Sequence, residues 1–195
     1  MKNKLKIIGI ILCLFALALV VNFGYYWKNF KHTLVKPAPV VEQEQAKEKT
    51  NPNLLLIPSL EITAPIIYLS ESDERAFQAG LLNGVVHYPG TANMGQTGNA
   101  YIFGHSSDFV WSRGQYKTVF ALLPRIEIGA EIQASDPQGN LYRYRVFETK
   151  VVEADDLSVL NQDTSGRKIL SVQTSYPVGT ALRRFVAVAE LVDDE

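Results

Sequence analysis

Hydrophobic and polar positions divide the chain into three parts. Residues 7–27 (IIGIILCLFALALVVNFGYYW) contain no charged side chain, and Lys2, Lys4 and Lys6 precede them. An apolar run of this length can cross a hydrocarbon core of about 30 Å as a helix. The aromatic residues that end the run are of the kind that settles at a bilayer interface. We therefore predict a cytoplasmic stub and transmembrane anchor over residues 1–27, with residues 7–27 in contact with membrane lipid.

The orientation of the anchor is predicted from the basic residues before it. Lysines flank the apolar run on both sides, so counting positive charges decides the direction only weakly. An N-terminal anchor preceded by lysines resembles an uncleaved signal, which predicts a single-pass membrane protein with an extracellular C-terminal domain. The alternative is a cleaved signal peptide, because Ala16-Leu17-Ala18 has the small-x-small form of a cleavage site.

Residues 28–53 form the second part and are predicted to be a flexible stalk. Pro37, Pro39 and Pro52 interrupt them, and the stretch from Glu42 to Lys49 has no apolar periodicity. A short helix there would have no apolar face to hold it against a core. The folded domain is therefore expected over residues 54–195.

The third part alternates short apolar segments with turn residues, as a mainly β domain does. Asp136-Pro137-Gln138-Gly139-Asn140 is the clearest hairpin connection. Two stretches look helical: residues 72–82, with Ser72 as N-cap, and residues 119–123, which end before Pro124. Seven or eight strands with two short helices indicate a closed or nearly closed β-barrel. The expected strands are Leu54–Ile57, Ile62–Ile67, Ala100–Phe103, Glu131–Ala134, Tyr142–Lys150, Lys168–Gln173 and Arg184–Leu191.

Composition excludes several classes of function. A length of 195 residues with 47% hydrophobic and 20% charged side chains fits one globular domain. The 19 Lys and Arg against 20 Asp and Glu leave no basic excess, so no nucleic-acid partner is expected. Cys13 is the only cysteine, which excludes an intrachain disulfide and a cysteine zinc site.

The three histidines are candidates for acid–base or metal chemistry. No two have a metal-ligand spacing, so no metal site is expected. His32 lies just outside the predicted anchor and is expected to be solvated, whereas His87 is better explained as a structural residue at a strand end. His105 follows a predicted strand and Gly104, so its imidazole should emerge at a strand end. A catalytic histidine and an ordinary loop histidine both fit that position.

A hydroxyl and a guanidinium are expected to meet near the C-terminus. Thr174 and Ser175 end one predicted strand, and Arg183 and Arg184 begin the next after a short Pro/Gly loop. Adjacent antiparallel strands lie about 4.8 Å apart, so side chains at matching ends can reach one small reactant. From these residues alone, an ordinary hairpin with surface arginines is the simpler explanation.

Several short motifs that follow one another along the chain indicate a family. Each motif is weak alone, but their order and spacing are specific. They are Ile57–Ile62, Ala64–Ile66, Gly84–Thr91, Gly98-Asn99, Ile102–Ser106, Phe120–Leu123 before Gly129, Thr174–Pro177 and Arg184–Val186. With the anchor and stalk, they resemble the sortases, membrane-anchored cysteine transpeptidases that attach proteins to bacterial cell walls or assemble pili. The family's eight-stranded β-barrel agrees with the strand pattern.

The resemblance implies three catalytic residues. His105 takes the place of the family histidine, Ser175 that of the nucleophilic cysteine, and Arg184 that of the arginine that stabilises the oxyanion or orients the substrate. Arg183 is the rival of Arg184. Because consecutive side chains of a strand point to opposite faces, only one of the two arginines can serve, and the residues that follow favour Arg184.

The resemblance also implies the partners. The barrel is expected to bind a C-terminal sorting signal of the Leu-Pro-x-Thr-Gly (LPxTG) kind, with Thr174 and Asn99 among the substrate-binding residues. The acceptor would be an amine of a peptidoglycan precursor or a pilin lysine, and no cofactor is expected.

Ser175 departs from the family pattern. A cysteine with a pKa of about 8.5 is partly thiolate at neutral pH, whereas a serine must give its proton to a neutral, oriented base such as His105. Ser175 is explained by an engineered Cys→Ser change, by a natural inactive homologue that still binds sorting peptides, or by a serine-dependent variant. We expect slow or absent turnover. The alternative function is a non-catalytic peptide-binding module at the cell surface.

Overall fold

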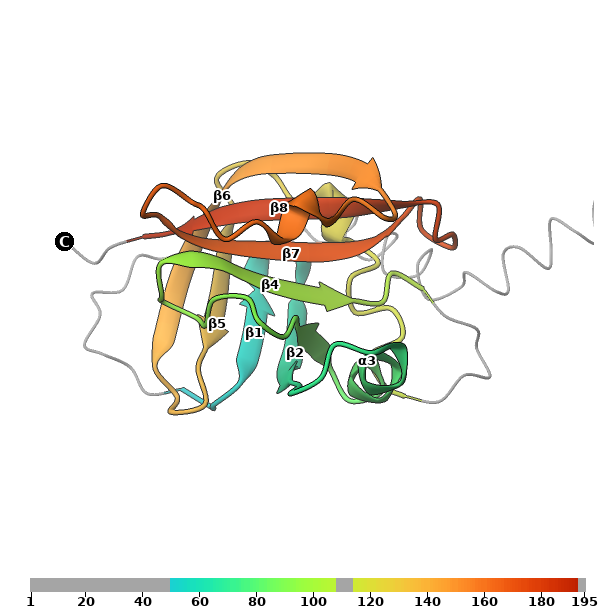
Figure 1. The fold of residues 1–195 in the computed structure, drawn as a ribbon, viewed down its shortest axis with the longest axis horizontal. Coiled ribbons are helices and arrows are strands. Elements are labelled where there is room, and N and C mark those ends of the chain that lie inside the picture. Colours follow the sequence, from blue (N-terminus) through green and yellow to red (C-terminus); the bar gives the residue numbers. More distant parts are fainter. Residues whose placement is uncertain (1–49, 108–113, 193–195) are drawn as a thin grey trace, which may run out of the picture.

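The fold is an eight-stranded closed barrel, as the strand pattern predicts. A computed structural model describes residues 50–107 and 114–192 (Figure 1). The strands are β1 (Leu54–Ile57), β2 (Ile62–Tyr68), β3 (Val85–His87), β4 (Gly98–Gly104), β5 (Glu131–Ser135), β6 (Leu141–Glu153), β7 (Lys168–Tyr176) and β8 (Arg183–Leu191). The helices of this part of the chain are α3 (Glu74–Leu81) and the 3-10 turns η1 (Pro58–Leu60), η2 (Leu123–Arg125) and η3 (Leu157–Leu160).

The predicted anchor and most of the predicted stalk lie outside the described residues. Within the described residues, no helix is long and apolar enough to cross a membrane. Residues 50–53 are hydrogen-bonded to the turn between β5 and β6: Thr50 N donates to Gly139 O and Asn53 N to Asp136 O, both at 3.1 Å. The last residues of the predicted stalk are therefore held against the folded domain.

The barrel order is β1-β2-β3-β4-β7-β8-β6-β5, with β5 closing onto β1. Two of the pairings are parallel, β2 with β3 and β4 with β7, and the others are antiparallel. A parallel pair needs a crossover connection, and α3 supplies it between β2 and β3. The ladder between β4 and β7 joins the first half of the described chain to the last (Figure 1).

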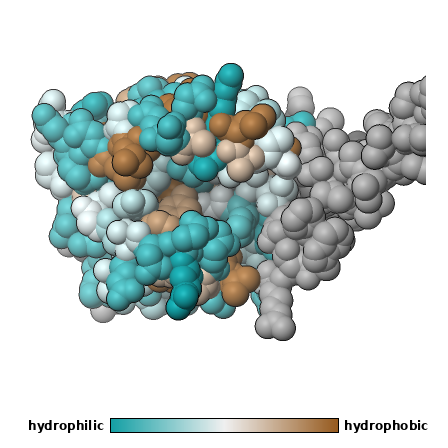
Figure 2. Space-filling view, turned by 45° about the vertical axis from the view of Figure 1, so that its right-hand side comes forward, coloured by the Kyte–Doolittle hydropathy of each residue, from teal (hydrophilic) through white to brown (hydrophobic). Residues whose placement is uncertain are grey.

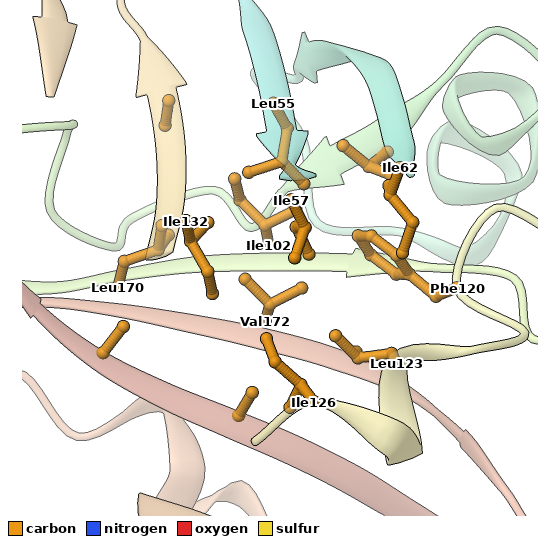
Figure 3. Close-up of a cluster of buried hydrophobic side chains, with 14 of the residues drawn as sticks. Leu55, Ile57, Ile62, Ile102, Phe120, Leu123, Ile126, Ile132, Leu170 and Val172 are labelled. Atoms are coloured by element: carbon orange, nitrogen blue, oxygen red, sulfur yellow. The ribbon is translucent and has the colours of Figure 1, made fainter. Parts of the chain in front are cut away.

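The main hydrophobic core fills the barrel. Successive side chains of a strand point to opposite faces, and the buried inward positions of β1, β4 and β7 are apolar except for Thr174. Leu55, Ile57, Ile102, Leu170 and Val172 are fully buried there and converge in one cluster (Figure 3). Burial of a side chain of this size stabilises a fold by about 1.5–3 kcal/mol. The alternation predicted from the sequence therefore has its physical basis in this interior.

A second, smaller core lies on the outer face of the sheet. It consists of Tyr101 on β4, Val159 on η3, Ile169 on β7, and Val186 and Val188 on β8. The connection between β6 and β7 thus lays η3 across the outside of these strands. We call this set the outer cluster.

The helix α3 begins one residue later than its predicted cap implies. Asp73, not Ser72, is the N-cap, and its Oδ1 accepts a hydrogen bond from Ala76 N at 2.8 Å. Phe77 of α3 contacts Phe103 edge-on, with 5.1 Å between ring centroids. This contact places α3 against the outer side of β4, next to the outer cluster.

The predicted helical turn over residues 119–123 is wrong. Those residues form successive turns, and η2 begins at Leu123 with Pro124 in its first turn. Proline is tolerated there because its missing N–H has no helical partner. Phe120 and Leu123 are fully buried in the main core. Their burial, rather than a helical period, explains the apolar residues of this segment.

The predicted hairpin connection between β5 and β6 is confirmed. Asp136 Oδ1 accepts hydrogen bonds from the backbone N–H groups of Gln138 and Asn140, both at 2.9 Å. Burial raises the pKa of the Asp136 carboxyl, but the hydrogen bonds from Asn140 and its neighbours outweigh burial and leave the pKa below 3.8. The turn is therefore held by an ionised carboxylate at neutral pH.

Candidate active site

Ser175 and Arg184 lie directly opposite each other on neighbouring strands. They are partners in the antiparallel ladder between β7 and β8. Opposite residues of such a ladder project to the same face, with Cβ atoms about 4.5–5.5 Å apart. The register therefore places Ser175 and Arg184 on the same face of the sheet, and both residues are half-buried.

The face that they share is the outside of the barrel. Thr174 and Phe185, the preceding pair of the same ladder, are buried toward the interior. Because side chains alternate, Ser175 and Arg184 point outward, on the side of the outer cluster.

His105 joins the same row from the third strand. The last parallel pair of β4 and β7 is Gly104 with Thr174, so the next residues along the two strands are His105 and Ser175. The His105 backbone carbonyl accepts a hydrogen bond from Phe120 N at 3.0 Å. A Cβ on Gly104 would lie 2.7 Å from the Phe120 ring, so only glycine allows this approach. The half-buried His105 thus follows β4 at the end of the ladder where Ser175 follows Thr174 on β7.

The two arginines face different surroundings. Arg184 Nη1 donates to Ala181 O and to Arg183 O, both at 3.0 Å, which folds the side chain over the connection between β7 and β8. Arg183 is paired with Tyr176, not with Ser175, and its Nε lies 3.5 Å from Glu153 Oε1. Of the two, Arg184 shares a face with Ser175.

A tyrosine and a glutamine lie on the outer face of the barrel near Ser175 and Arg184. The Tyr101 hydroxyl donates to Gln173 Oε1 at 2.7 Å, and Gln173 precedes Ser175 by two residues on the same face of β7. Burial raises the pKa of Tyr101, and the positive charge of Arg184 opposes that rise. Tyr101 is therefore a neutral hydrogen-bond donor at any physiological pH. The sequence motifs did not predict this bond, because strand alternation shows which face a residue occupies but not its cross-strand partner.

The two residues predicted to bind substrate are both buried. Thr174 is fully buried, and its hydroxyl donates to Gly104 O at 2.9 Å. Asn99 is 5% exposed, and its Nδ2 donates to Val159 O at 2.8 Å. In this structure the two side chains tie β4 to β7 and to η3, and their contact with a peptide stays a prediction. No three His, Cys, Asp or Glu side chains gather into a group that could hold a metal ion within residues 50–107 and 114–192.

The family model of the sortase domain matches residues 55–192 of this chain. The chain belongs to the sortase family. No curated protein sequence matches it. Sortase structures resemble its fold: the Clostridium perfringens sortase D5 transpeptidase at 24% identity and a TM-score of 0.58, covering 72% of this chain and 78% of that one. Sortase C-1 from Actinomyces oris matches at 23% identity and a TM-score of 0.58, and the match covers 72% of this chain and 73% of that one.

A third structure, sortase C1 from Streptococcus suis, matches at 17% identity and a TM-score of 0.62, covering 74% of each chain. Identities this low show a shared fold and no more. The barrel expected of a sortase is therefore confirmed, whereas the roles of His105, Ser175 and Arg184 stay predictions.

His87 is the structural strand-end residue that the sequence predicts. It ends β3, is 4% exposed, and stacks on Tyr68 with 4.8 Å between ring centroids. Its Nε2 lies 2.8 Å from Ala92 O, so this nitrogen donates to the carbonyl. Burial lowers the His87 pKa from 6.5, and the hydrogen bond to Ala92 only partly opposes the effect.

The lowered His87 pKa predicts a loss of stability in mild acid. Below pH 6.5 the unfolded chain binds a proton that the folded chain resists, so the free energy of unfolding should fall by up to about 1.4 kcal/mol per pH unit until the folded pKa is reached. Burial raises the Tyr68 pKa to about 12, so that ring stays neutral. Hydrogen bonds hold the pKa of the Asp136 carboxyl below its usual value, so this group stays ionised over the same interval.

The measurement is urea unfolding between pH 7.5 and pH 5 for the wild type and for His87→Gln, whose amide cannot take up a proton. The variant should lose less stability over this interval. Equal slopes for the two proteins would show that His87 does not cause the acid sensitivity.

Proposed function

We propose that this sortase-family protein binds LPxTG-like sorting signals on the outer face of β4, β7 and β8, with His105, Ser175 and Arg184 at the reacting bond. The observation that carries the proposal is the register that places Ser175 opposite Arg184 and ends the β4–β7 ladder one residue before His105 and Ser175. Cell-wall anchoring or pilus assembly is the process that such a reaction would serve. Its partners would be the sorting peptide and an acceptor amine.

Arg184 has the donors that an oxyanion role requires. Both hydrogen bonds of its side chain to described residues use Nη1. Guanidinium carries five N–H donors and keeps its charge at any physiological pH. The donors on Nε and Nη2 are therefore suited to the carbonyl oxygen of the Thr-Gly bond as it becomes negative.

Ser175 limits the reaction. In the proposed cysteine form, the thiolate attacks the threonine carbonyl, the Thr-Gly bond breaks, and the glycine amine leaves with a proton that protonated His105 donates. The acceptor amine then attacks the thioester and releases the thiol. With Ser175, the hydroxyl proton must pass to His105 during attack, because an alcohol, unlike a thiol, has no appreciable ionised fraction at neutral pH. Turnover should therefore be slow or absent.

Replacing Ser175 by cysteine tests the nucleophile assignment. Ser175→Cys should raise cleavage of a fluorogenic LPxTG peptide at least about tenfold, because a thiol is the stronger nucleophile at neutral pH. Ser158→Cys, which places a thiol on exposed η3, is the matched control and should gain nothing. If Ser175→Cys binds the peptide and still does not cleave it, the assignment fails.

The two arginines can be separated in the Ser175→Cys background. Loss of an oxyanion donor typically lowers kcat by about 10²–10³-fold, so Arg184→Ala should lose activity on that scale. Arg183→Ala should change kcat/KM less than about threefold, because Arg183 contacts Glu153 and not Ser175. Initial rates measure both. A larger loss for Arg183→Ala would reverse the assignment.

A non-catalytic peptide-binding module is the second candidate function, and the hydroxyl at position 175 favours it. In that case peptide affinity survives Ser175→Ala and His105→Ala, and intact-mass measurement detects no acyl-enzyme with either serine or cysteine. An acyl-enzyme with Ser175 itself would instead support the serine-dependent variant.

We propose further that residues 7–27 anchor the protein in the cytoplasmic membrane with the barrel outside. The full chain should stay in the membrane pellet after alkaline carbonate extraction, and a chain lacking residues 1–27 should not. Protease added to cells whose cell wall has been removed and whose membrane is unbroken should digest the barrel. A shorter soluble product in the medium would instead support the cleaved signal peptide.

A further inference from the structure

One glutamine side chain joins three separate segments at the start of β4, the end of that strand remote from His105. Gln162, on the connection between β6 and β7, accepts hydrogen bonds at Oε1 from Ala92 N at 3.0 Å and from Asn99 N at 3.2 Å. Its Nε2 donates to Asn99 O at 3.1 Å and to Leu160 O at 2.8 Å. The amide thus connects the β3–β4 loop, the start of β4 and the end of η3.

Asn99 adds a second tie between the same elements. Its Nδ2 donates to Val159 O at 2.8 Å, so backbone and side chain of one β4 residue both hold the η3 segment. Gly98 makes the close approach possible, because a Cβ there would lie 3.1 Å from Gln162 Oε1 and the residue has a φ of +117°. We call Gln162 and Asn99 the amide clamp.

The clamp fixes η3 over the outer cluster. Val159 is a member of that cluster together with Tyr101 and Val186, and Leu160 packs against the cluster. Leu157, at the start of η3, is 71% exposed. On β8, Arg184 precedes Val186 of this cluster by two residues and shares its face, and His105 follows the end of β4. The position of η3 therefore sets how much apolar surface is open beside the row of candidate catalytic residues.

Exposed apolar residues lie on the other side of the row as well. Leu182, in the connection between β7 and β8, is 70% exposed. The space-filling view shows brown residues in separate groups on a mostly teal surface (Figure 2). A peptide with leucine and proline side chains would gain binding free energy by covering these apolar groups, provided that the distance between the groups is held constant.

We propose that Gln162, together with Asn99, is a positioning residue that holds η3 at the spacing required to bind the sorting peptide, an inference that rests on the proposed function. Gln162 does not touch the reacting atoms in this proposal. Its loss should therefore weaken peptide binding and leave the chemical step nearly unchanged.

The first measurement is hydrogen exchange of single backbone amides. The N–H groups of Ala92 and Asn99 both donate to Gln162 Oε1, so Gln162→Ala should speed their exchange at least about tenfold. Gln162→Glu keeps an acceptor for both N–H groups but loses the bonds donated to Asn99 O and Leu160 O, and should restore part of their protection. The control is Gln138→Ala, an exposed glutamine in the β5–β6 turn.

The second measurement is peptide binding and turnover. We expect Gln162→Ala to raise the Kd of fluorescein-labelled LPxTG peptides with varied x about tenfold, and to raise KM similarly in the Ser175→Cys background with kcat changed less than about twofold. Gln138→Ala should match the parent protein. Thermal melting identifies any variant that fails to fold. Asn99→Ala is a second variant, and it removes only the hydrogen bond from the Asn99 side chain to Val159 O.

The outcomes separate the two proposals. If the parent protein and its Ser175→Cys variant bind no peptide of the panel, the proposed function fails and the positioning role fails with it. If they bind, and Gln162→Ala binds equally well despite faster exchange, only the positioning role is overturned. A fall in kcat with unchanged KM would also overturn it, because the clamp would then act on the chemical step.

Discussion

The parallel pairing of β4 with β7 is the constraint on which the rest of the structure depends. It brings Gly104 opposite Thr174, and the buried hydrogen bond from the Thr174 hydroxyl to Gly104 O, at 2.9 Å, closes the end of the ladder. Parallel strands end at the same edge, so the residues that follow this pair are necessarily neighbours. His105 and Ser175 would otherwise belong to unrelated loops. A buried backbone carbonyl needs a donor, and Thr174 supplies it where the ladder ends.

Most of the barrel could be predicted from the sequence, because its strands alternate over four or more residues and are separated by turn residues. The segments that were missed lack that signal. β3 has only three residues, Val85–His87, too few to display a period. η3 is held by its cap, where Asp156 Oδ1 accepts from Ser158 N at 2.9 Å, and by the burial of Val159 on distant strands. Contacts of this kind are made by residues far apart in the sequence and leave no local pattern.

The residue types of the candidate site could be predicted from the sequence, but the positions of these residues relative to one another could not. Motif order pointed to His105, Ser175 and an arginine, but the identity of the arginine depends on register. A slip of one residue between β7 and β8 would bring Arg183 opposite Ser175 and turn Arg184 to the other face. The observed register pairs Ser175 with Arg184. The sequence also does not show whether a polar strand residue faces solvent or the interior. Thr174 is buried, so its hydroxyl bonds to Gly104 O within the barrel and is not exposed to a peptide.

The hydroxyl at position 175 changes less of this arrangement than its place in the mechanism implies. Sulfur and oxygen differ in how readily the nucleophile loses its proton, but the β7–β8 register and the Arg184 donors depend on the backbone and on a permanently charged side chain. Under either proposed function, the peptide-binding face is therefore the same. The transpeptidase and the binding module differ in whether the atom at position 175 can attack, which depends on its proton transfer and not on the strand register.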